Sequence, residues 1–182
     1  MRDHSLERIL DAAHARMLER GLRRLTMDDV ARHAGLARVT VYRRFSRKAD
    51  LVQAVILREL ERFLKAFEQA MAALPTPADQ VAEGFAITLR LARAHPLLSR
   101  LLATEPETIL PQLTLEAGPY LAAARDYLAA HVGDAEVAEL YVRVALSFVL
   151  IPESAIPLRN DEDARAYARR HLVPLLPSEG IN

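Results

Sequence analysis

The sequence predicts an all-α protein, and three observations carry that prediction. Ala, Leu, Arg and Glu, which favour helices, are abundant along the chain. Only six glycines and ten prolines occur among the 182 residues, so long stretches contain no helix breaker. Apolar residues recur at spacings of three and four, and no segment alternates as a β-strand does. Because 51% of the residues are apolar, a chain of this length can bury a hydrophobic core.

Three helices are predicted in the N-terminal part of the chain. The first runs from Ser5, a capping residue, to about residue 20, has one apolar stripe and is stopped by a glycine. The second covers about 26–35 and has two aspartates in its first turn, where the positive end of the helix dipole favours acids. The third is short and covers about 37–44.

Six further helices are predicted after these, which makes about nine in total. A serine caps the first of them, prolines separate the next ones, and an aspartate caps the long apolar helix that follows Gly133. Gly118-Pro119 offers a break within one of them, and Pro174 ends the last one. The expected spans are about 46–74, 77–95, a short helix and a turn within HPLLSRLLATEPE (95–107), then 107–131, 134–151 and, from 160 or 161, to about 173.

The charge of the chain is unevenly distributed. Residues 1–50 contain 12 Lys and Arg against 7 Asp and Glu, a net charge of +5, and residues 51–182 contain 12 against 17, a net charge of −5. A basic head on an acidic body indicates a polyanionic partner for the head, and chance variation of surface charge is the alternative.

The composition also bears on the cellular compartment. The chain has no cysteine, which excludes disulfides and thiolate chemistry. The N-terminus carries charges where a signal peptide needs an apolar core, and the longest apolar stretch, around VALSFVLI, is too short to span a bilayer. We therefore expect a soluble, cytoplasmic protein without a membrane partner.

Residues 26–45 have the pattern of a helix-turn-helix, in which two helices are joined by a short turn. Ala31 is small enough to let the second helix cross closely, and Gly35 can adopt the left-handed conformation that the turn requires. The expected apolar interior of the pair consists of Val30, Ala34, Leu36, Val41 and Phe45.

Basic and polar residues lie on the outer side of the short third helix. Arg can bond guanine bidentately, the methyl groups of Thr and Val can contact thymine, and Tyr and Thr hydroxyls can donate to phosphates. Arg47 and Lys48 begin the fourth helix, where the dipole disfavours cations unless a phosphate lies between; two solvated surface cations are the alternative. The candidate DNA-contacting residues are Thr26, Arg38, Val39, Thr40, Tyr42, Arg43, Arg47 and Lys48.

With these residues, the segment ILDAAHARMLERGLRRLTMDDVARHAGLARVTVYRRFSRKADLVQAV (9–55) resembles the DNA-binding head of TetR-type transcriptional regulators. The matching positions are Gly21, Thr26, Val30, Ala31, Ala34, Gly35, Thr40, Tyr42, Phe45 and Lys48. The resemblance implies a DNA-binding domain over 1–50 and a helical ligand-binding and dimerisation domain over 51–182. It also implies a homodimeric repressor of a near-palindromic DNA operator, which a small-molecule inducer releases.

Two residues of the recognition helix depart from the family pattern. Ala37 replaces a small hydroxyl residue that often caps this helix, so we expect a less well capped helix. Val39 replaces the Gly, Ala or Pro that is common there and directs a bulky apolar side chain toward the groove. The operator sequence therefore cannot be carried over from relatives.

The body contains candidates for an inducer pocket and for a dimer interface. The resemblance implies an inducer pocket in the body, and for each single residue an ordinary packed core is the alternative. The expected pocket residues are Phe63, Phe67, Phe85, Thr88, Leu89, His95, Leu102, Gln112 and Tyr120. Their mixture suits a mostly apolar ligand. A broad apolar stripe on the last two helices predicts a four-helix dimer interface, or else the closure of the monomer core; its residues are Val137, Tyr141, Val144, Phe148, Tyr167 and Leu172.

Other function classes have less support. The sequence contains no glycine-rich phosphate loop, no nucleophile motif and no pair of histidines at the spacing of a helical metal site, so we expect no enzyme, no metal and no cofactor. Glu105 and Glu107 flank Pro106 and are explained as acids at a helix start. A helical small-molecule-binding or scaffolding protein without operator binding remains the alternative.

The long fourth helix suggests how a ligand could act on DNA binding. It carries both Lys48 of the head and Phe67 of the expected pocket. A ligand that pressed on Phe63 or Phe67 could pivot this helix and change the separation of the two recognition helices, which must be about 34–36 Å to meet successive major grooves.

Overall fold

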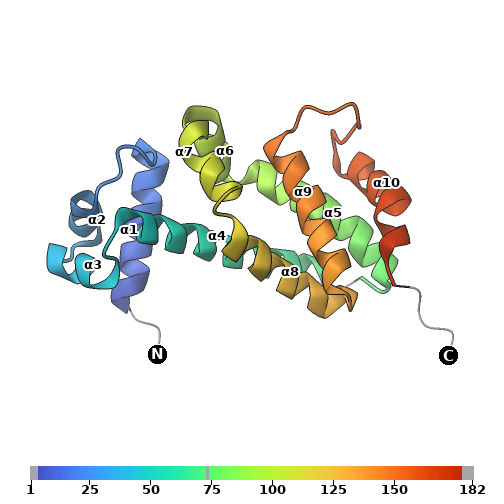
Figure 1. Cartoon of the computed structure of the whole chain (residues 1–182), viewed down its shortest axis with the longest axis horizontal. Coiled ribbons are helices and arrows are strands. Elements are labelled where there is room, and N and C mark those ends of the chain that lie inside the picture. The colour runs from blue at the N-terminus through green and yellow to red at the C-terminus, as the bar shows by residue number, and fades with distance from the viewer. Residues whose placement is uncertain (1–3, 73, 178–182) are drawn as a thin grey trace. The chain divides into compact units, whose positions relative to one another are not determined.

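The computed structural model describes residues 4–72 and 74–177 and confirms the all-α fold (Figure 1). Within these residues there are ten α-helices and one short 3₁₀ helix, and no strand. They are α1 (His4–Arg20), α2 (Met27–Ala34), α3 (Arg38–Arg44), α4 (Lys48–Met71), α5 (Pro77–Ala94), α6 (Pro96–Thr104), α7 (Pro106–Leu113), α8 (Gly118–Val132), α9 (Ala135–Leu150), α10 (Asp161–His171) and η1 (Val173–Leu175).

The segment 107–131, in which the sequence offers a break at Gly118-Pro119, forms two helices, α7 and α8, and this accounts for the tenth helix. The chain leaves the α-helical path at Thr114, whose φ is −128° and ψ is −82°, and the Glu116 N–H closes a turn on the Pro111 carbonyl at 2.9 Å. Gly118 and Pro119 then start α8. Proline suits this first turn because the N–H that it lacks would have no helical partner there.

Two predicted caps are wrong, and three helix starts are as expected. α1 already begins at His4, so Ser5 lies inside its first turn, and α4 begins two residues after Ser46. The cap predicted at Asp134 is confirmed, and the structure also has capping side chains at the expected starts of α2 and α10. These three residues accept hydrogen bonds from first-turn N–H groups; they are Thr26, Asp134 and Asn160. These side chains satisfy amide groups that have no partner inside the helix.

The chain forms two compact units, and each unit consists of two segments that are separated in the sequence. The first comprises the residues up to Glu59 together with His95–Ala117, and the second comprises Leu60–Ala94 and the residues from Gly118 onward. The N-terminal head therefore packs with α6 and α7, although these lie far from it in sequence. The functional division expected at residue 50 stays a prediction.

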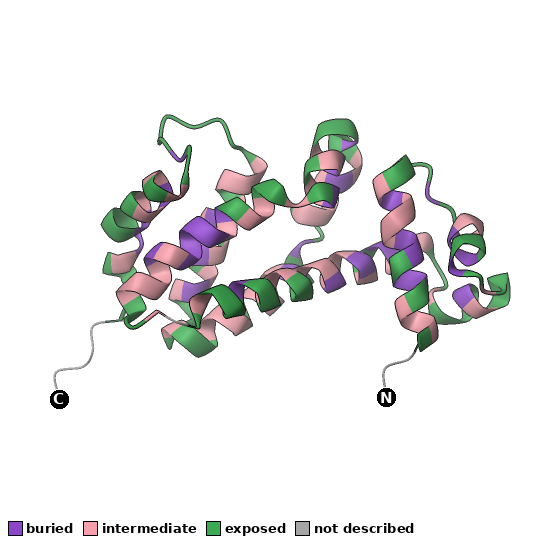
Figure 2. Ribbon diagram, turned by 180° about the vertical axis from the view of Figure 1, so that it is seen from behind, coloured by how far each residue is buried: buried purple, intermediate pink, exposed green. Residues whose placement is uncertain are grey.

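The first unit has its own hydrophobic core beneath the helix-turn-helix (Figure 2). Each of its helices contributes fully or nearly fully buried side chains; they include Ile9, Ala13, Met17, Val30, Ala31, Val41, Leu51, Val55, Leu97, Leu101 and Ile109. This core fixes α1, α2, α3 and the first half of α4 against α6 and α7. The head is thus a rigid platform, on which exposed side chains can be held in place.

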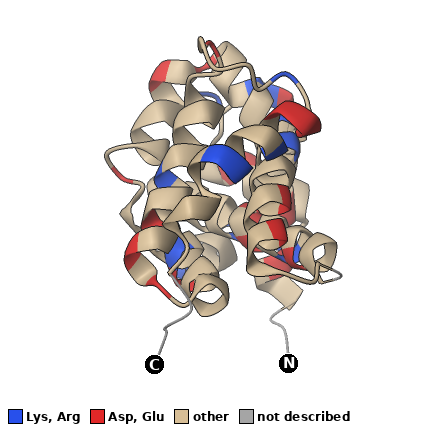
Figure 3. Cartoon of the chain, turned by 90° about the vertical axis from the view of Figure 1, so that its right-hand side faces the viewer, with Lys and Arg blue, Asp and Glu red and all other residues tan. Residues whose placement is uncertain are grey.

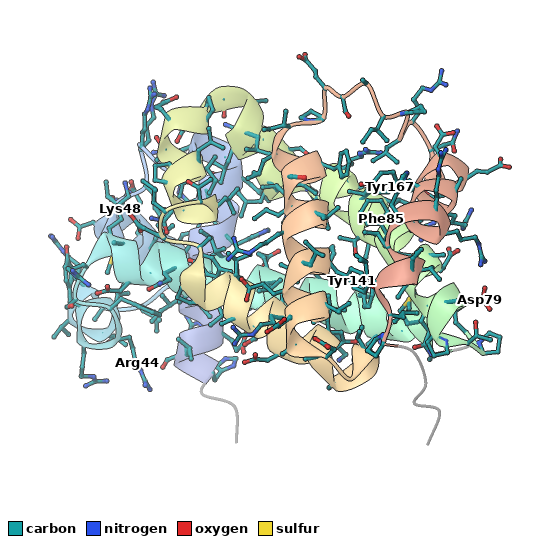
Figure 4. The ribbon with its side chains drawn as sticks, turned by 45° about the vertical axis from the view of Figure 1, so that its right-hand side comes forward. Arg44, Lys48, Asp79, Phe85, Tyr141 and Tyr167 are labelled. Carbon is teal, nitrogen blue, oxygen red and sulfur yellow. The ribbon has the colours of Figure 1, made fainter. Side chains whose placement is uncertain are left out.

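The second unit is built around the packing of α5, α9 and α10. Small buried residues allow α5 and α10 to approach closely; they are Ala82, Ala86, Ala164 and Ala168. Aromatic rings fill the space between the helices, and the ring of Phe85 stacks on that of Tyr167 with 5.4 Å between their centroids (Figure 4). The Tyr141 hydroxyl donates a hydrogen bond of 2.9 Å to the Leu172 carbonyl.

Ion pairs border this core and join α10 to α5, and Figure 3 shows basic and acidic residues interspersed along the helices. Arg165 forms two hydrogen bonds to the Glu83 carboxylate, and Arg169 Nη2 lies 2.8 Å from Asp79 Oδ1. The arginine beside it holds the pKa of Glu83 below its usual value. Such partly exposed pairs typically contribute about 0–1 kcal/mol each, so the buried core remains the main stabilising contact.

Candidate nucleic-acid interface

The turn of the helix-turn-helix is built as the sequence predicts. The Thr26 hydroxyl accepts a hydrogen bond of 3.1 Å from the Asp29 N–H and so begins α2. Gly35 ends α2 with a φ of +62°, in the left-handed region that favours glycine. The Leu36 N–H donates to the Ala31 carbonyl at 3.0 Å, which closes the turn before α3.

A residue of α1 that the sequence did not single out holds this turn from outside. Arg8 Nη2 donates to the carbonyl oxygens of Ala34 and Gly35 at 2.5 and 3.2 Å. These carbonyls have no partner within α2 because the helix ends there. The supporting role could not be predicted, since Arg8 and Gly35 are separated by 27 residues and only the packing of α1 on α2 brings them together.

The short helix α3 presents most of its side chains to solvent. Only Val41 is buried, whereas Val39 is 71% exposed and Tyr42 is 44% exposed. Arg43 is exposed as well, and Thr40 is partly exposed. An apolar valine at this degree of exposure does not contribute to the fold of the chain, so the outer face of α3 is available for a partner.

The expected weakness of the recognition-helix cap is confirmed. Ala37 is the N-cap of α3 and provides no side-chain hydrogen bond. The Thr40 N–H instead donates to the Ala37 carbonyl at 2.9 Å. With seven residues and no cap, α3 depends on the burial of Val41 for its stability rather than on helix propensity.

Two of the candidate arginines already have acidic partners within the chain. Arg38 Nη2 lies 2.6 Å from Asp28 Oδ2, and Arg47 Nη2 lies 2.6 Å from Asp50 Oδ1. The hydrogen bond to Asp50 raises the pKa of Arg47 and lowers that of Asp50. Both guanidinium groups are largely exposed, so they can exchange these partners for a nucleic acid.

Lys48, at the first position of α4, is more constrained than the arginines (Figure 4). Its Nζ donates to the Arg23 carbonyl at 3.4 Å. Partial burial lowers the pKa of this ammonium group, and the negative charge of Glu105 acts in the opposite direction. The side chain therefore occupies a defined position beside the α1–α2 turn.

The expected pocket residues are divided between the two units. Six lie in the second unit; they are Phe63, Phe67, Phe85, Thr88, Leu89 and Tyr120. Phe67, Phe85, Leu89 and Tyr120 are buried there. Gly84 allows the Phe67 ring to lie against α5, because a Cβ at this glycine would be only 2.9 Å from the ring.

The other three expected pocket residues lie in the first unit and have local partners. The His95 ring accepts a hydrogen bond of 3.2 Å from the Leu98 N–H through Nδ1 and thereby caps α6, while its Nε2 lies 3.2 Å from Glu59 Oε2. Leu102 packs on the core of this unit, and Gln112 hydrogen-bonds to Glu116. Their membership of an inducer pocket stays a prediction.

A cleft is present elsewhere in the second unit. It has a volume of about 240 Å³ and lies between the ends of α5 and α9 and the loop before α10. Its lining residues are Arg93, Phe148, Pro152, Ser154, Ala155, Ile156, Pro157, Leu158 and Arg159. Arg93 ties the loop to α5 by donating to the Leu158 carbonyl at 2.8 Å.

The expected dimer residues differ in how far they remain accessible. Tyr141 and Leu172 are buried within the second unit, and Phe148 packs edge-on against Phe85 and Tyr167. Val137 and Val144 are partly exposed. Leu140 of the same helix is 42% exposed. The accessible apolar part of α9 is therefore narrower than the stripe in the sequence.

The fold and this site define a helix-turn-helix DNA-binding protein, and comparison with known proteins identifies its family. Residues 9–55 match the family model of bacterial regulatory proteins, tetR family, and residues 77–169 match that of the bacterial tetracyclin repressor, C-terminal domain. The second match alone covers half of the chain. The chain belongs to the TetR family of DNA-binding transcriptional regulators, which confirms the resemblance seen in its head.

Individual relatives extend over nearly the whole chain. The HTH-type transcriptional regulator AlkX of Mycobacterium tuberculosis is 29% identical and covers 95% of this chain and 85% of its own length. The TetR family repressor AlkX from a Dietzia species, implicated in biodegradation of n-alkanes, superposes with a TM-score of 0.72 at 26% identity over 94% of each chain. The multidrug binding protein EbrR, solved with imidazole, shares the fold with a TM-score of 0.65 at 21% identity over 98% of each chain.

The two AlkX proteins are transcriptional regulators rather than enzymes. Within residues 4–72 and 74–177, no helix has both the length and the apolar character needed to cross a membrane.

Proposed function

We propose that the chain is a homodimeric repressor that binds a near-palindromic operator through α3 and is released by a small, mostly apolar molecule. The observation that carries the DNA-binding part is the outer face of α3, where Val39 and Tyr42 are exposed and only Val41 serves the core. A helix that exposes an apolar and basic face on a rigid head has the geometry to enter a major groove.

The roles of the individual residues follow from their chemistry. Arg38 and Arg43 can bond guanine, and Val39 and Thr40 can contact the methyl group of thymine. Tyr42, Arg47 and Lys48 can bind phosphates, which fixes the register on the duplex. Thr26 caps α2 by accepting from the Asp29 N–H, and the first-turn N–H groups that this contact leaves over can be offered to a further phosphate.

The ligand is proposed to bind in the second unit among the buried aromatic residues. Phe67, Phe85 and Tyr120 give this interior an apolar character. Since the Dietzia AlkX repressor is implicated in biodegradation of n-alkanes, we take a hydrocarbon-like molecule as the first class of effector to test. α4 would transmit the effect, because it carries Phe67 and also Lys48.

Random-duplex selection followed by sequencing tests the proposal. We expect the full chain to enrich a near-palindromic motif at moderate salt. A protein that binds hydrocarbon-like ligands in thermal-shift assays but enriches no motif would instead be a small-molecule-binding or scaffolding protein. For the ligand part, each n-alkane that raises the unfolding temperature is titrated into the protein–DNA complex, and unchanged DNA affinity would contradict release by that ligand.

A further inference from the structure

Glu105 is a buried carboxylate that lies outside the helix-turn-helix yet contacts the DNA-binding head. The residue is 9% exposed and lies between α6 and α7. Its Oε2 accepts a hydrogen bond of 3.0 Å from the Arg23 N–H in the turn between α1 and α2. A buried carboxylate is costly without such partners, so its position calls for a role.

Gly21 makes room for this carboxylate. It ends α1 with a φ of +78°, and a Cβ at this position would overlap with the carboxylate of Glu105. The glycine therefore serves two purposes, since it allows the left-handed conformation and the close approach of an acidic side chain. Any larger residue at position 21 would displace Glu105 from the turn.

The backbone of Arg23 connects Glu105 with Lys48. Its N–H donates to Glu105, and its carbonyl accepts from Lys48 Nζ at 3.4 Å. The turn is thus held from one side by a carboxylate and from the other by an ammonium group. The negative charge of Glu105 also favours the charged form of Lys48, against the effect of burial on the pKa of this lysine.

We infer that Glu105 is a positioning residue for DNA binding, which holds the Arg23 backbone and the Lys48 ammonium group where that ammonium can meet a phosphate. This inference rests on the proposed function of the head. A lysine held in place before binding loses less conformational freedom when it contacts DNA. Glu105 would therefore strengthen DNA binding although its charge has the same sign as the phosphates.

The variant Glu105→Gln separates this effect from simple charge repulsion. Glutamine keeps the shape, but its neutral amide oxygen accepts from the Arg23 N–H only about half as strongly as the carboxylate does, and the negative charge that attracts Lys48 is removed. Coulomb repulsion alone predicts tighter DNA binding by the variant. The positioning role predicts weaker binding, by about two- to twelvefold, the fold-change that corresponds to the entropy of immobilising one long side chain.

Glu107→Gln is the matched control. Glu107 lies two residues further along, is exposed and pairs with the Arg23 side chain. The substitution removes one negative charge from the same region without touching the buried contact. We expect its DNA affinity to equal or exceed that of the wild-type chain.

The measurement is the affinity of the full chain for a fluorescent 20-base-pair duplex of arbitrary sequence, over a series of NaCl concentrations. Glu105→Gln should weaken binding and lower the slope of log K against log[salt] by about 0.9, the value for one phosphate contact. The double variant Glu105→Gln/Lys48→Ala should bind within about twofold of Lys48→Ala alone, because residues that act together are not additive.

Several outcomes would overturn the inference. One is a DNA affinity of Glu105→Gln that equals or exceeds that of the wild-type chain. Another is an equal loss of DNA affinity on Glu105→Gln in the wild-type and the Lys48→Ala backgrounds, which would indicate a merely structural role for Glu105. If Glu105→Gln fails to fold by circular dichroism, Glu105→Asp, which keeps the charge but is too short to reach the turn, is carried through the same cycle. A wild-type chain without measurable duplex affinity would instead refute the proposed DNA-binding function itself.

Discussion

Single residues on the DNA-facing surface already have protein partners before any DNA is bound. Arg38 pairs with Asp28, and Arg47 pairs with Asp50. Exposed pairs of this kind add about 0–1 kcal/mol to stability, so their main effect is to restrict where the guanidinium groups can lie. Binding to DNA must exchange these carboxylates for bases or phosphates, and the acidic partners thus act against unspecific attraction to any polyanion.

Base reading and phosphate binding can be separated with Arg38→Ala and Tyr42→Ala. We expect Arg38→Ala to relax the preference at one operator position by about 1–3 kcal/mol, the value for a lost bidentate contact with guanine. Tyr42→Ala should weaken all duplexes similarly and lower the salt slope by about 0.9. The affinities of a selected operator and its single-base variants measure both effects, and a uniform loss across these variants for Arg38→Ala would refute its base-reading role.

The Tyr141 hydroxyl predicts a pH effect on the stability of the second unit. Burial raises the pKa of Tyr141 to about 12, from 10 for an ordinary tyrosine. The pKa of Tyr141 is higher in the folded chain than in the unfolded chain, so its neutral hydroxyl stabilises the fold. This contribution to the free energy of unfolding is fully present below pH 10 and is lost as the pH rises toward 12, by roughly 2–3 kcal/mol in total. Urea unfolding between pH 8 and 12 should show a steeper loss for the wild-type chain than for Tyr141→Phe.

Tyr141→Phe also tests the hydrogen bond itself. At pH 7 the substitution should lower the free energy of unfolding by about 0.5–1.5 kcal/mol, since the Leu172 carbonyl loses one of its two donors and keeps only the Leu175 N–H. Parallel pH profiles of the two proteins above pH 10 would show that the hydroxyl is accessible to water.

Among the helices, the contact between α5 and α10 depends most on side-chain size. Ala164 and Ala168 are almost completely buried on α10, whereas Ala166 of the same helix is exposed. Close approach of two helices requires small residues at the contact, and larger ones would force the helices apart. The ion pairs at the border of this contact can adjust when the two helices move apart, but the buried side chains between the helices would lose their packing.

Ala168→Leu should therefore lower the free energy of unfolding by about 1–3 kcal/mol, the usual cost of overpacking. Ala166→Leu is the control, because it adds the same atoms to the exposed side of α10 and leaves helix propensity nearly unchanged. Chemical unfolding monitored by circular dichroism compares the two. Equal stability of both variants would show that α10 is not closely packed on α5.

The helices could be predicted from the sequence where local chemistry determines them. The helix start at Thr26, the cap at Asp134 and the glycine at position 35 depend on residues a few positions apart, and the structure has them as expected. The break between α7 and α8 was placed too late because a turn at Thr114 precedes the Gly118-Pro119 signal.

The candidate site could be predicted only in part, because only some of its features depend on residues that are close in sequence. Exposure of Val39 and Tyr42 follows from helical periodicity, but the partners of Arg8, Lys48 and Glu105 are 25 to 82 residues away. Such contacts depend on how helices pack together. No local pattern indicates that the acid before Pro106 is buried against the head, and its explanation as a helix-start acid was incomplete.

For the whole molecule, the accessible apolar part of α9 predicts where a second copy would bind. Leu140 and Val144 lie four residues apart on α9, and Ile151, at its C-terminal cap, is 66% exposed. Tyr141 and Leu172 are buried within their own chain, and Phe148 packs against Phe85 and Tyr167 of the same chain. A homodimer of the proposed kind would thus use the outer edge of the predicted stripe.

Leu140→Arg should convert the protein from a dimer into a monomer with unchanged helix content and a large loss of operator affinity. Leu115→Arg is the matched control, since Leu115 is 90% exposed in the turn between α7 and α8 and should leave the dimer intact. Sedimentation velocity at micromolar concentration reports the assembly. A wild-type chain that sediments as a monomer would contradict the proposal.

The outer face of α3 also has an evolutionary consequence. Val39, Tyr42 and Arg43 take no part in the core, which receives only Val41 from this helix. Substitutions at these exposed positions usually change stability by less than about 0.5 kcal/mol. After gene duplication, a copy of this regulator could drift toward new target genes through such changes while its fold stays intact. Selection would then act on the regulatory network almost independently of selection for folding.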